Sequence, residues 1–241
     1  MIRATGITVR RGGRAILDEV DCSIQPGRVT VAMGKNGAGK STLLNVLAGT
    51  LGADAGAVNV DGRGLADYAP AELAGKRAVL AQSAHLGFPL SVVEVVELGC
   101  YHRYDQLSTR QRVKRVHHYL ELLELTSLSG RAYPTLSGGE KKRVLLAKCL
   151  LQLDGEGHNS SISKRYLLLD EPTAALDVEQ QYRFVQLATR LARERGLGVF
   201  AVLHDLNLAA RCADELGHRY LYADCGQRPW LSRDAFPDLH P

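Results

Sequence analysis

Four short runs of largely apolar residues predict buried strands in this chain. They cover residues 29–33, 78–81, 166–169 and 199–203, without a sustained alternation of apolar and polar positions. Continuous apolar runs are typical of a parallel sheet covered on both faces, because side chains on either side of the strand are then buried. The pattern therefore predicts an α/β fold built on a mostly parallel sheet.

Polar residues follow these runs where each strand is expected to end. Gln82, Asp170 and His204 follow the later three runs, and the first run leads into a glycine-rich segment that starts at Gly34. Open sheets of parallel strands bind ligands beyond the carboxyl ends of the strands. These residues are therefore predicted to converge on one site.

Helical spacing of apolar residues begins directly after the glycine-rich segment. Leucines and valines recur at positions 43, 44, 46 and 47, as expected for one face of a helix that follows Lys40. Gly49 is expected to end that helix. The order is strand, glycine-rich loop, helix.

The middle of the chain changes from a strand pattern to a helical one. Valines at 92, 95 and 96, and apolar residues at 113, 116, 120 and 123, lie on plausible helix faces. We predict a single domain, 1–241, with a core formed by residues 1–82 and 156–241 and an inserted helical subdomain at about 83–155. Residues 153–161 are small and polar, which predicts a solvent loop without a function of its own.

Composition narrows the classes of protein that this chain can belong to. It has 241 residues, 45% of them hydrophobic, enough for a substantial core. Its formal net charge is +4, with basic and acidic residues interleaved, so nucleic acid is not the expected partner. The 5 cysteines are dispersed without a Cys-x-x-Cys pair, which favours reduced thiols in the cytoplasm. No apolar run reaches the roughly 18 residues of a membrane span, so any membrane association is expected to be peripheral.

The glycine-rich segment carries the first recognisable chemistry. Residues 34–41 read Gly-Lys-Asn-Gly-Ala-Gly-Lys-Ser, a pattern whose backbone N–H groups wrap a phosphate chain. Lys40 would reach the outer phosphates and Ser41 would hold Mg²⁺. The alternative is a plain glycine-rich turn, but the strand before it and the helix after it favour phosphate binding.

An acid pair and a serine segment add two further candidates. Asp170 and Glu171 follow a buried strand, where one carboxylate can bind Mg²⁺ and the other can polarise the water that attacks a γ-phosphate. Leu-Ser-Gly-Gly-Glu at 136–140 precedes a basic amphipathic helix and offers a second anion site at a helix N-terminus. A strand-end acid pair and a simple helix cap are the alternative interpretations.

These segments, in this order, resemble the nucleotide-binding subunit of ABC transporters from about residue 7 to residue 216. The 136–140 pentapeptide, the signature segment hereafter, is highly specific for that family. The resemblance implies a P-loop NTPase (RecA-like) core with an N-terminal antiparallel β part and an inserted α-helical subdomain that carries the signature. It also implies that two copies pair head-to-tail, the signature of one covering the ATP on the phosphate loop of the other.

The resemblance assigns further roles. Gln82 would sense Mg²⁺ and the permease, Asp177 would contact the second copy, and His204 would contact the γ-phosphate. The predicted catalytic residues are Lys40, Gln82, Glu171 and His204, and the predicted Mg²⁺ ligands are Ser41, Gln82 and Asp170. The predicted ATP contacts are Gly34, Lys35, Asn36, Gly37, Ala38, Gly39, Lys40, Ser41, Thr42, Arg11, Ser137, Gly138, Gly139 and Asp177.

The chain departs from the usual family pattern at three places. Arg11 stands where an aromatic residue usually stacks on adenine, and a guanidinium can stack on the base instead. Lys35 replaces a commoner proline or arginine, and Lys141 and Lys142 follow the signature in place of glutamines or arginines, without removing a catalytic group. The end of the chain, 220–241, matches the family only loosely, and no role is carried over to it.

Within the family, residues 88–99 and 203–211 resemble importers of haem, ferric siderophores and cobalamin. The segments at 78–83 and 166–171, with the loop before the latter, are most similar to haemin importer ATPases. That implies two transmembrane permease subunits, a periplasmic haem-binding protein as an indirect partner, and a peripheral position on the cytoplasmic face of the inner membrane. Ferric siderophore or cobalamin import is the runner-up.

Two other classes of function are weighed against transport. DNA-repair and chromosome ATPases of the same superfamily carry long coiled coils or zinc modules between the glutamine and the signature, whereas this chain has a short interval between Gln82 and Leu136. A non-catalytic regulatory module would not need an intact set of Lys40, Asp170, Glu171 and His204. Both alternatives are therefore less favoured than an ATPase.

Overall fold

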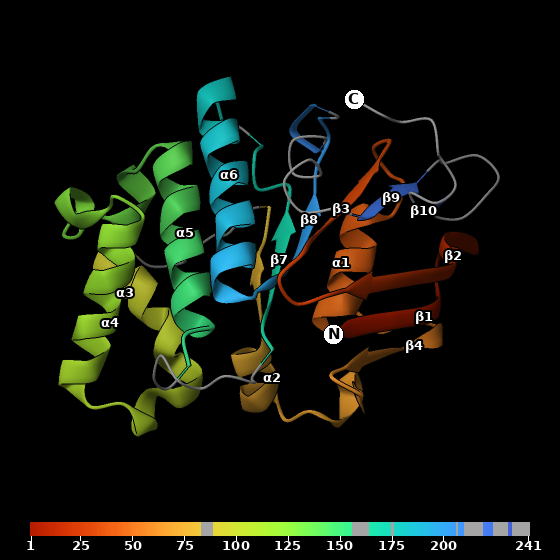
Figure 1. Ribbon diagram of the computed structural model, residues 1–241, viewed down its shortest axis with the longest axis horizontal. Helices are drawn as coiled ribbons and strands as arrows, with labels where there is room; N and C mark the ends of the chain where they lie inside the picture. The colour runs from red at the N-terminus through yellow and green to blue at the C-terminus, as the bar shows by residue number, and fades with distance from the viewer. Residues whose placement is uncertain are drawn as a thin grey trace.

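The computed structural model contains two β-sheets and a group of helices (Figure 1). It describes residues 1–82, 89–155, 164–174, 176–205 and 207–209, together with the strands at 219–223 and 231–232. The helices α3, α4 and α5 lie on one side of the molecule, and β1, β2 and β4 lie on the other (Figure 1). None of the described helices is long and apolar enough to cross a membrane.

The larger sheet has six strands in the order β10-β9-β3-β8-β7-β6. Neighbouring strands from β9 to β6 run parallel, and only the β10–β9 pair is antiparallel. The bounds are β3 Val29–Gly34, β6 Arg77–Leu80, β7 Tyr166–Asp170, β8 Gly198–Val202, β9 Arg219–Ala223 and β10 Leu231–Ser232. The four strands predicted from apolar runs are all present, within one residue at either end, and form the parallel centre.

Continuous apolar strands arise because this sheet is covered on both faces. In β7, Tyr166 and Leu168 belong to a core shared with α1 and the smaller sheet, whereas Leu167 and Leu169 pack into a core shared with α3, α5 and α6. Successive side chains of a strand point to opposite faces. No position in the strand faces water, which confirms the predicted α/β fold.

The smaller sheet is antiparallel, with the strand order β2-β1-β4-β5. Its strands are β1 Ile2–Arg11, β2 Arg14–Ile24, β4 Ala55–Val60 and β5 Arg63–Gly64. The apolar runs do not reveal it, because only one face packs on α1 and its strands alternate buried with exposed positions. The family resemblance alone led us to expect this sheet.

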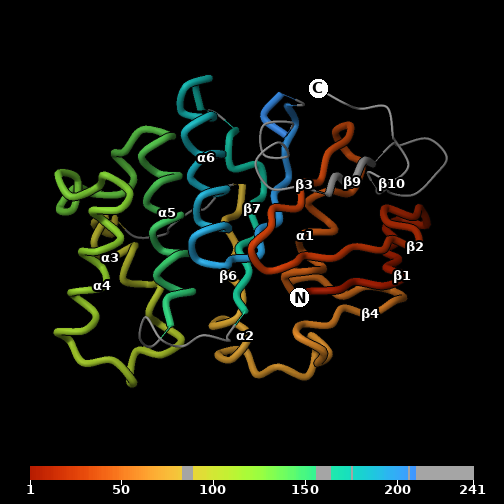
Figure 2. Tube along the Cα trace, in the orientation of Figure 1, coloured from red at the N-terminus to blue at the C-terminus, as the bar shows by residue number. Residues whose placement is uncertain are grey.

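Helices fill the space beside and between the sheets, as the tube trace also shows (Figure 2). The α-helices are α1 Lys40–Ala48, α2 Pro70–Lys76, α3 Val92–Glu97, α4 Thr109–Leu122, α5 Gly138–Gln152 and α6 Val178–Arg195. The 3₁₀ turns are η1 Leu65–Asp67, η2 Leu98–Gln106, η3 Thr126–Leu128 and η4 Tyr133–Thr135. The predicted helices at 43–47, 92–96 and 113–123 correspond to α1, α3 and α4.

Several sequence predictions fall partly outside the described residues, including the start of the helical subdomain at 83–88. The solvent loop at 153–161 overlaps residues 156–163, which the structure does not describe. Most of 220–241 is likewise outside them, although the strands β9 and β10 pair antiparallel within it. The division of the chain near residues 82 and 156 stays a prediction.

Candidate active site

The glycine-rich loop joins the end of β3 to the start of α1. Gly39, the residue before the helix, has a φ of 88°, and a Cβ at this position would lie 2.8 Å from the carbonyl oxygen of Ile16. Only glycine fits such a left-handed and crowded position. The loop is therefore held open as a cradle of backbone N–H groups at a helix N-terminus, which is an anion-binding arrangement.

Lys40 has its ammonium group folded over this loop. Its side chain is buried, and Nζ donates to the carbonyl oxygens of Gly34 at 2.8 Å and Lys35 at 2.9 Å. The loop carbonyls thus hold the cation beside the backbone donors of the cradle. Lys40 is positioned to neutralise a phosphate chain that enters the loop.

Asp170 is the last residue of β7 and lies beside the loop. Its Oδ1 accepts a 2.8 Å hydrogen bond from the hydroxyl of Ser41. Desolvation raises the pKa of the Asp170 carboxyl above its ordinary value, with a further contribution from Glu171, and the Ser41 hydrogen bond only partly offsets this. A hydroxyl and a carboxylate oxygen side by side fit Mg²⁺, which binds oxygen ligands and commonly takes one or two protein carboxylates plus substrate phosphates.

Glu171 holds its carboxylate between two other predicted site residues. Gln82 Nε2 donates to Glu171 Oε2 at 2.7 Å, and His204 Nε2 lies 2.6 Å from Glu171 Oε1. Glu171 has a φ of 45°, an unusual value for a residue with a side chain. This strain sits where the chain leaves β7, consistent with a functional position of the carboxylate.

One contact of the site was not predicted from the sequence. Lys142, on the second turn of α5, donates from Nζ to the carbonyl oxygen of Gln82 at 2.8 Å. Burial lowers the pKa of Lys142, and the carboxylates of Asp170 and Glu171 oppose that shift. The sequence signal was the second lysine after the signature, which we interpreted only as a departure from the family pattern.

A cleft of about 850 Å³ gathers most of the predicted residues. Its lining is Arg11, Ile16, Asn36, Gly37, Ala38, Gly39, Lys40, Ser41, Thr42, Gln82, Glu171 and His204. Ile16, from β2, is the lining residue that sequence reasoning missed. The cleft is thus formed by β1, β2, the loop between β3 and α1, the start of α1, and residues that follow β6, β7 and β8.

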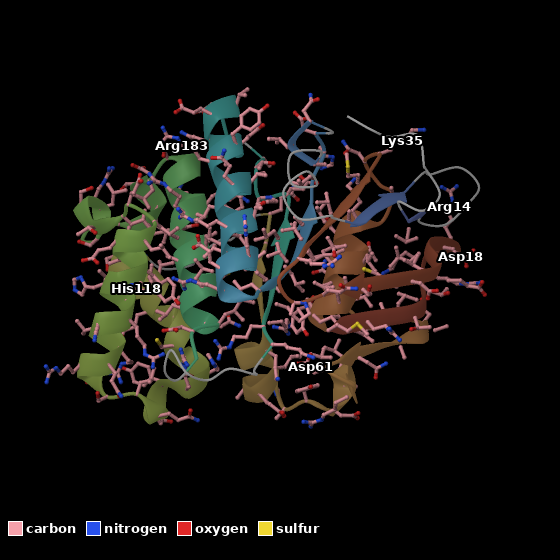
Figure 3. The ribbon with its side chains drawn as sticks, viewed as in Figure 1. Arg14, Asp18, Lys35, Asp61, His118 and Arg183 are labelled. Atoms are coloured by element: carbon pink, nitrogen blue, oxygen red, sulfur yellow. The ribbon has the colours of Figure 1, made fainter. Side chains whose placement is uncertain are left out.

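The signature segment does not join this cleft within one chain. Ser137 and Gly139 line a second groove between α5 and α6, with Leu176 and Gln180. In Figure 3, Lys35 marks the phosphate loop on the side of the β-strands, and Arg183, which also lines the second groove, marks the start of α6 on the side of the helices. Among the described residues, none lines both grooves.

Ser137 and Asp177 both begin helices. The hydroxyl of Ser137 accepts from the backbone N–H of Glu140 at 3.3 Å and caps α5, and Asp177 accepts from Gln180 N at 2.8 Å and caps α6. The helix cap that the sequence offered as an alternative is therefore present at Ser137. A serine hydroxyl that accepts one hydrogen bond still has a proton to donate, so capping is compatible with an additional anion contact.

A phosphate cradle with its lysine, a hydroxyl–carboxylate pair and an oriented glutamate define a P-loop nucleoside triphosphatase. The family model described as "ABC transporter" matches residues 17–174. The chain belongs to the ABC transporter family and is an ATP-binding ATPase.

Relatives and solved structures agree with this assignment. The "Hemin import ATP-binding protein HmuV" of Rhizobium meliloti is 42% identical over 90% of this chain and 80% of its own length. The protein of the same name from Gloeobacter violaceus is 44% identical over 90% of this chain and 77% of its own. The dimeric post-hydrolysis structure of the ATP-binding cassette MJ0796, bound to ADP and Pi, has a TM-score of 0.77 at 28% identity and covers 94% of this chain and 97% of that one.

Proposed function

We propose that this chain is the energy-coupling ATPase of an ABC importer for haemin. The observation that carries the proposal is the extent of similarity to proteins named for hemin import, 42% to 44% identity across 90% of the chain. The ATPase part of the proposal is also supported by a cleft whose residues have the geometry for ATP hydrolysis. Ferric siderophores and cobalamin, the runner-up substrates, become outcomes of the test below.

The triphosphate is proposed to lie on residues 34–41, with Arg11 beside the base. Backbone N–H groups of the loop and Lys40 would bind the phosphates, and Thr42 would close the end of the cradle. Ser41, Asp170 and Gln82 would hold Mg²⁺. When bound, the ion neutralises charge on the β- and γ-phosphates.

Hydrolysis then depends on a carboxylate that orients the attacking water. Glu171 is proposed to accept the water's proton, since its carboxylate is already fixed by Gln82 and His204. His204 would also contact the γ-phosphate. Phosphoryl transfer requires alignment and charge neutralisation more than covalent chemistry, so these groups suffice.

Two copies are proposed to pair head-to-tail. The Ser137, Gly138, Gly139 and Asp177 region of one copy would then close over the phosphate loop of the other. The separation of the two grooves within one chain supports this arrangement. Each bound ATP would contact both copies and favour the closed dimer, and hydrolysis would let it open.

The permease is proposed to dock on the surface of the helical subdomain from Gln82 to about Tyr101, of which residues 83–88 lie outside the described part of the chain. Two side chains at the start of η2 support this, because Tyr101 is 79% exposed and Leu98 is 43% exposed. Large exposed apolar groups often mark interaction sites. The chain would then sit peripherally on the cytoplasmic face of the inner membrane, bound to two permease subunits, with a periplasmic haem-binding protein on the far side.

The test is ATPase activity in proteoliposomes that contain this chain and its permease. Haem-loaded binding protein is expected to stimulate ATP hydrolysis several-fold, and the unloaded protein much less. Stimulation only by a ferric siderophore or cobalamin complex would replace haemin as the substrate while keeping the importer. No hydrolysis in any combination would contradict the proposal.

A further inference from the structure

The buried lysine of α5 joins two parts of the chain that belong to different elements. Lys142 is 9% exposed, and its ammonium donates to the backbone of Gln82, 60 residues earlier in the sequence. Gln82 in turn donates from its side chain to Glu171. A continuous series of hydrogen bonds therefore runs from α5 through Gln82 and Glu171 to His204.

Nearby acceptors and carboxylates offset part of the cost of burying the Lys142 ammonium. A cation removed from water is costly unless nearby anions and acceptors compensate it. The negative charges of Asp170 and Glu171 favour the protonated form of Lys142, and the Gln82 carbonyl oxygen accepts a hydrogen bond from its ammonium. Lys40 lies at the phosphate loop, where its ammonium donates to the carbonyl oxygens of Gly34 and Lys35.

The same helix also carries the residue proposed to cap the second copy's ATP. Ser137 is the N-cap of α5, and Lys142 follows it by five positions, about 7.5 Å along a rigid helix. The Lys142 hydrogen bond therefore connects the first turns of α5 with the backbone of Gln82. The position of Gln82 decides in turn where its amide holds the Glu171 carboxylate.

We infer that Lys142 is a positioning residue for ATP hydrolysis, which fixes the Gln82 segment against the Glu171 carboxylate of its own chain. This role rests on the proposed function, because it presupposes that Glu171 orients the attacking water. Lys142 is not among the residues that line the cleft at the phosphate loop. It acts through the glutamine and links the signature helix to the hydrolytic carboxylate.

The test compares three variants of the full chain. Lys142→Met keeps length and packing but removes the donor, and it is expected to lower kcat at least tenfold while the Kd for ATP changes less than twofold. Lys142→Arg restores a cationic donor and is expected to regain a large part of kcat. Lys141→Met is the matched control, since consecutive helix positions point about 100° apart, and it is expected to keep the wild-type kcat.

The possible results distinguish failure of the positioning role of Lys142 from failure of the proposed ATPase function. An active wild type with an unchanged kcat in Lys142→Met would overturn the positioning role and leave the ATPase intact. A loss of ATP binding and of thermal stability in parallel with kcat, without recovery in Lys142→Arg, would also overturn it, because that result describes a purely structural lysine. An inactive wild type would instead contradict the proposed function.

Discussion

His204 Nε2 lies 2.6 Å from Glu171 Oε1, although the two residues are 33 positions apart in sequence. The contact follows from the sheet, because β7 and β8 are parallel neighbours in which Asp170 pairs with Val202. Residues that follow the two strands therefore emerge side by side. Gln82, beyond the end of β6 on the other side of β7, reaches the same carboxylate.

Glu171→Gln is expected to abolish nearly all turnover while ATP still binds. The amide keeps the size of the side chain but cannot take a proton from water, so hydrolysis should fall by about a hundredfold or more. Because ATP then persists, the variant should accumulate as a dimer in gel filtration with Mg-ATP. Glu72→Gln, a surface acid paired with Arg63, is the control. Wild-type hydrolysis by Glu171→Gln would refute the role of the glutamate.

Mixing two inactive variants tests whether the site is shared between copies. Lys40→Ala removes the phosphate-binding lysine, and Ser137→Asp keeps a good N-cap for α5 but places a carboxylate against the neighbour's γ-phosphate. Each variant alone is expected to lose most activity, since both sites of its dimer are damaged. In a mixed dimer one site has an intact loop and an intact serine, so hydrolysis should reappear.

The control for that experiment is Ser108→Asp. Ser108 also caps a helix, α4, with the same capping box, but lies on a different helix from the signature. It is expected to keep wild-type activity. Absence of any recovery in the mixture, with both variants folded, would contradict a head-to-tail pair.

Arg11→Tyr is expected to tighten ATP binding. Arg11 lines the cleft, and a stacked aromatic ring is worth about 0.5–1.5 kcal/mol beyond its buried area, which corresponds to roughly two- to tenfold in Kd. Fluorescence titration with ATP and GTP measures the effect. Arg10→Tyr, on the opposite face of the same strand, should leave Kd unchanged. Equal Kd values for wild type and Arg11→Tyr would place the base elsewhere.

Asp61→Ala is expected to lower the free energy of unfolding by about 2–3 kcal/mol, because it leaves the hydroxyl of the fully buried Tyr166 without an acceptor and removes the partner of two partly exposed cations. Asp61 lies at the lower end of the view in Figure 3. Its carboxylate accepts from the hydroxyl of the fully buried Tyr166 at 2.6 Å, from Lys76 at 3.2 Å and from the Met1 amine at 2.8 Å. Urea unfolding at pH 7 measures the loss, and Asp18→Ala, an exposed acid, is the control.

The same residue gives a defined pH dependence. Burial acts to raise the pKa of Asp61, but hydrogen bonds from the Met1 amine, Tyr166 and Lys76 outweigh it, so the pKa lies below its ordinary 3.8. A depressed pKa means that the contribution to stability is fully present above pH 3.8 and is lost as the pH falls through the folded value. The difference between wild type and Asp61→Ala should therefore shrink only below about pH 4. A deficit that disappears near neutrality would exclude this carboxylate as its source.

The sequence by itself determined the parts of this protein that depend on neighbours in the chain. The phosphate loop at 34–41, the strands on either side and the helix after it follow from glycine placement and apolar spacing. The strand-end rule predicted that Gln82, Asp170 and His204 converge. Gln82 and His204 line one cleft, together with Glu171, which follows Asp170 in the chain. The antiparallel sheet was predictable only from resemblance, since its strands are half exposed.

The tertiary structure decided what depends on packing between distant segments. The Ser41 hydroxyl donates a hydrogen bond to Asp170, which is 129 positions away in the sequence, and Lys142 donates one to Gln82, which is 60 positions away. Placing Ser137 in a separate groove from the phosphate loop is likewise a result of how α5 packs beside the sheet. Local propensity specifies where helices and strands begin and end. Which side chains of distant elements contact one another is decided only when helices pack on both faces of the sheet. For that reason the contact of Lys142 with Gln82 could be identified only from the folded structure.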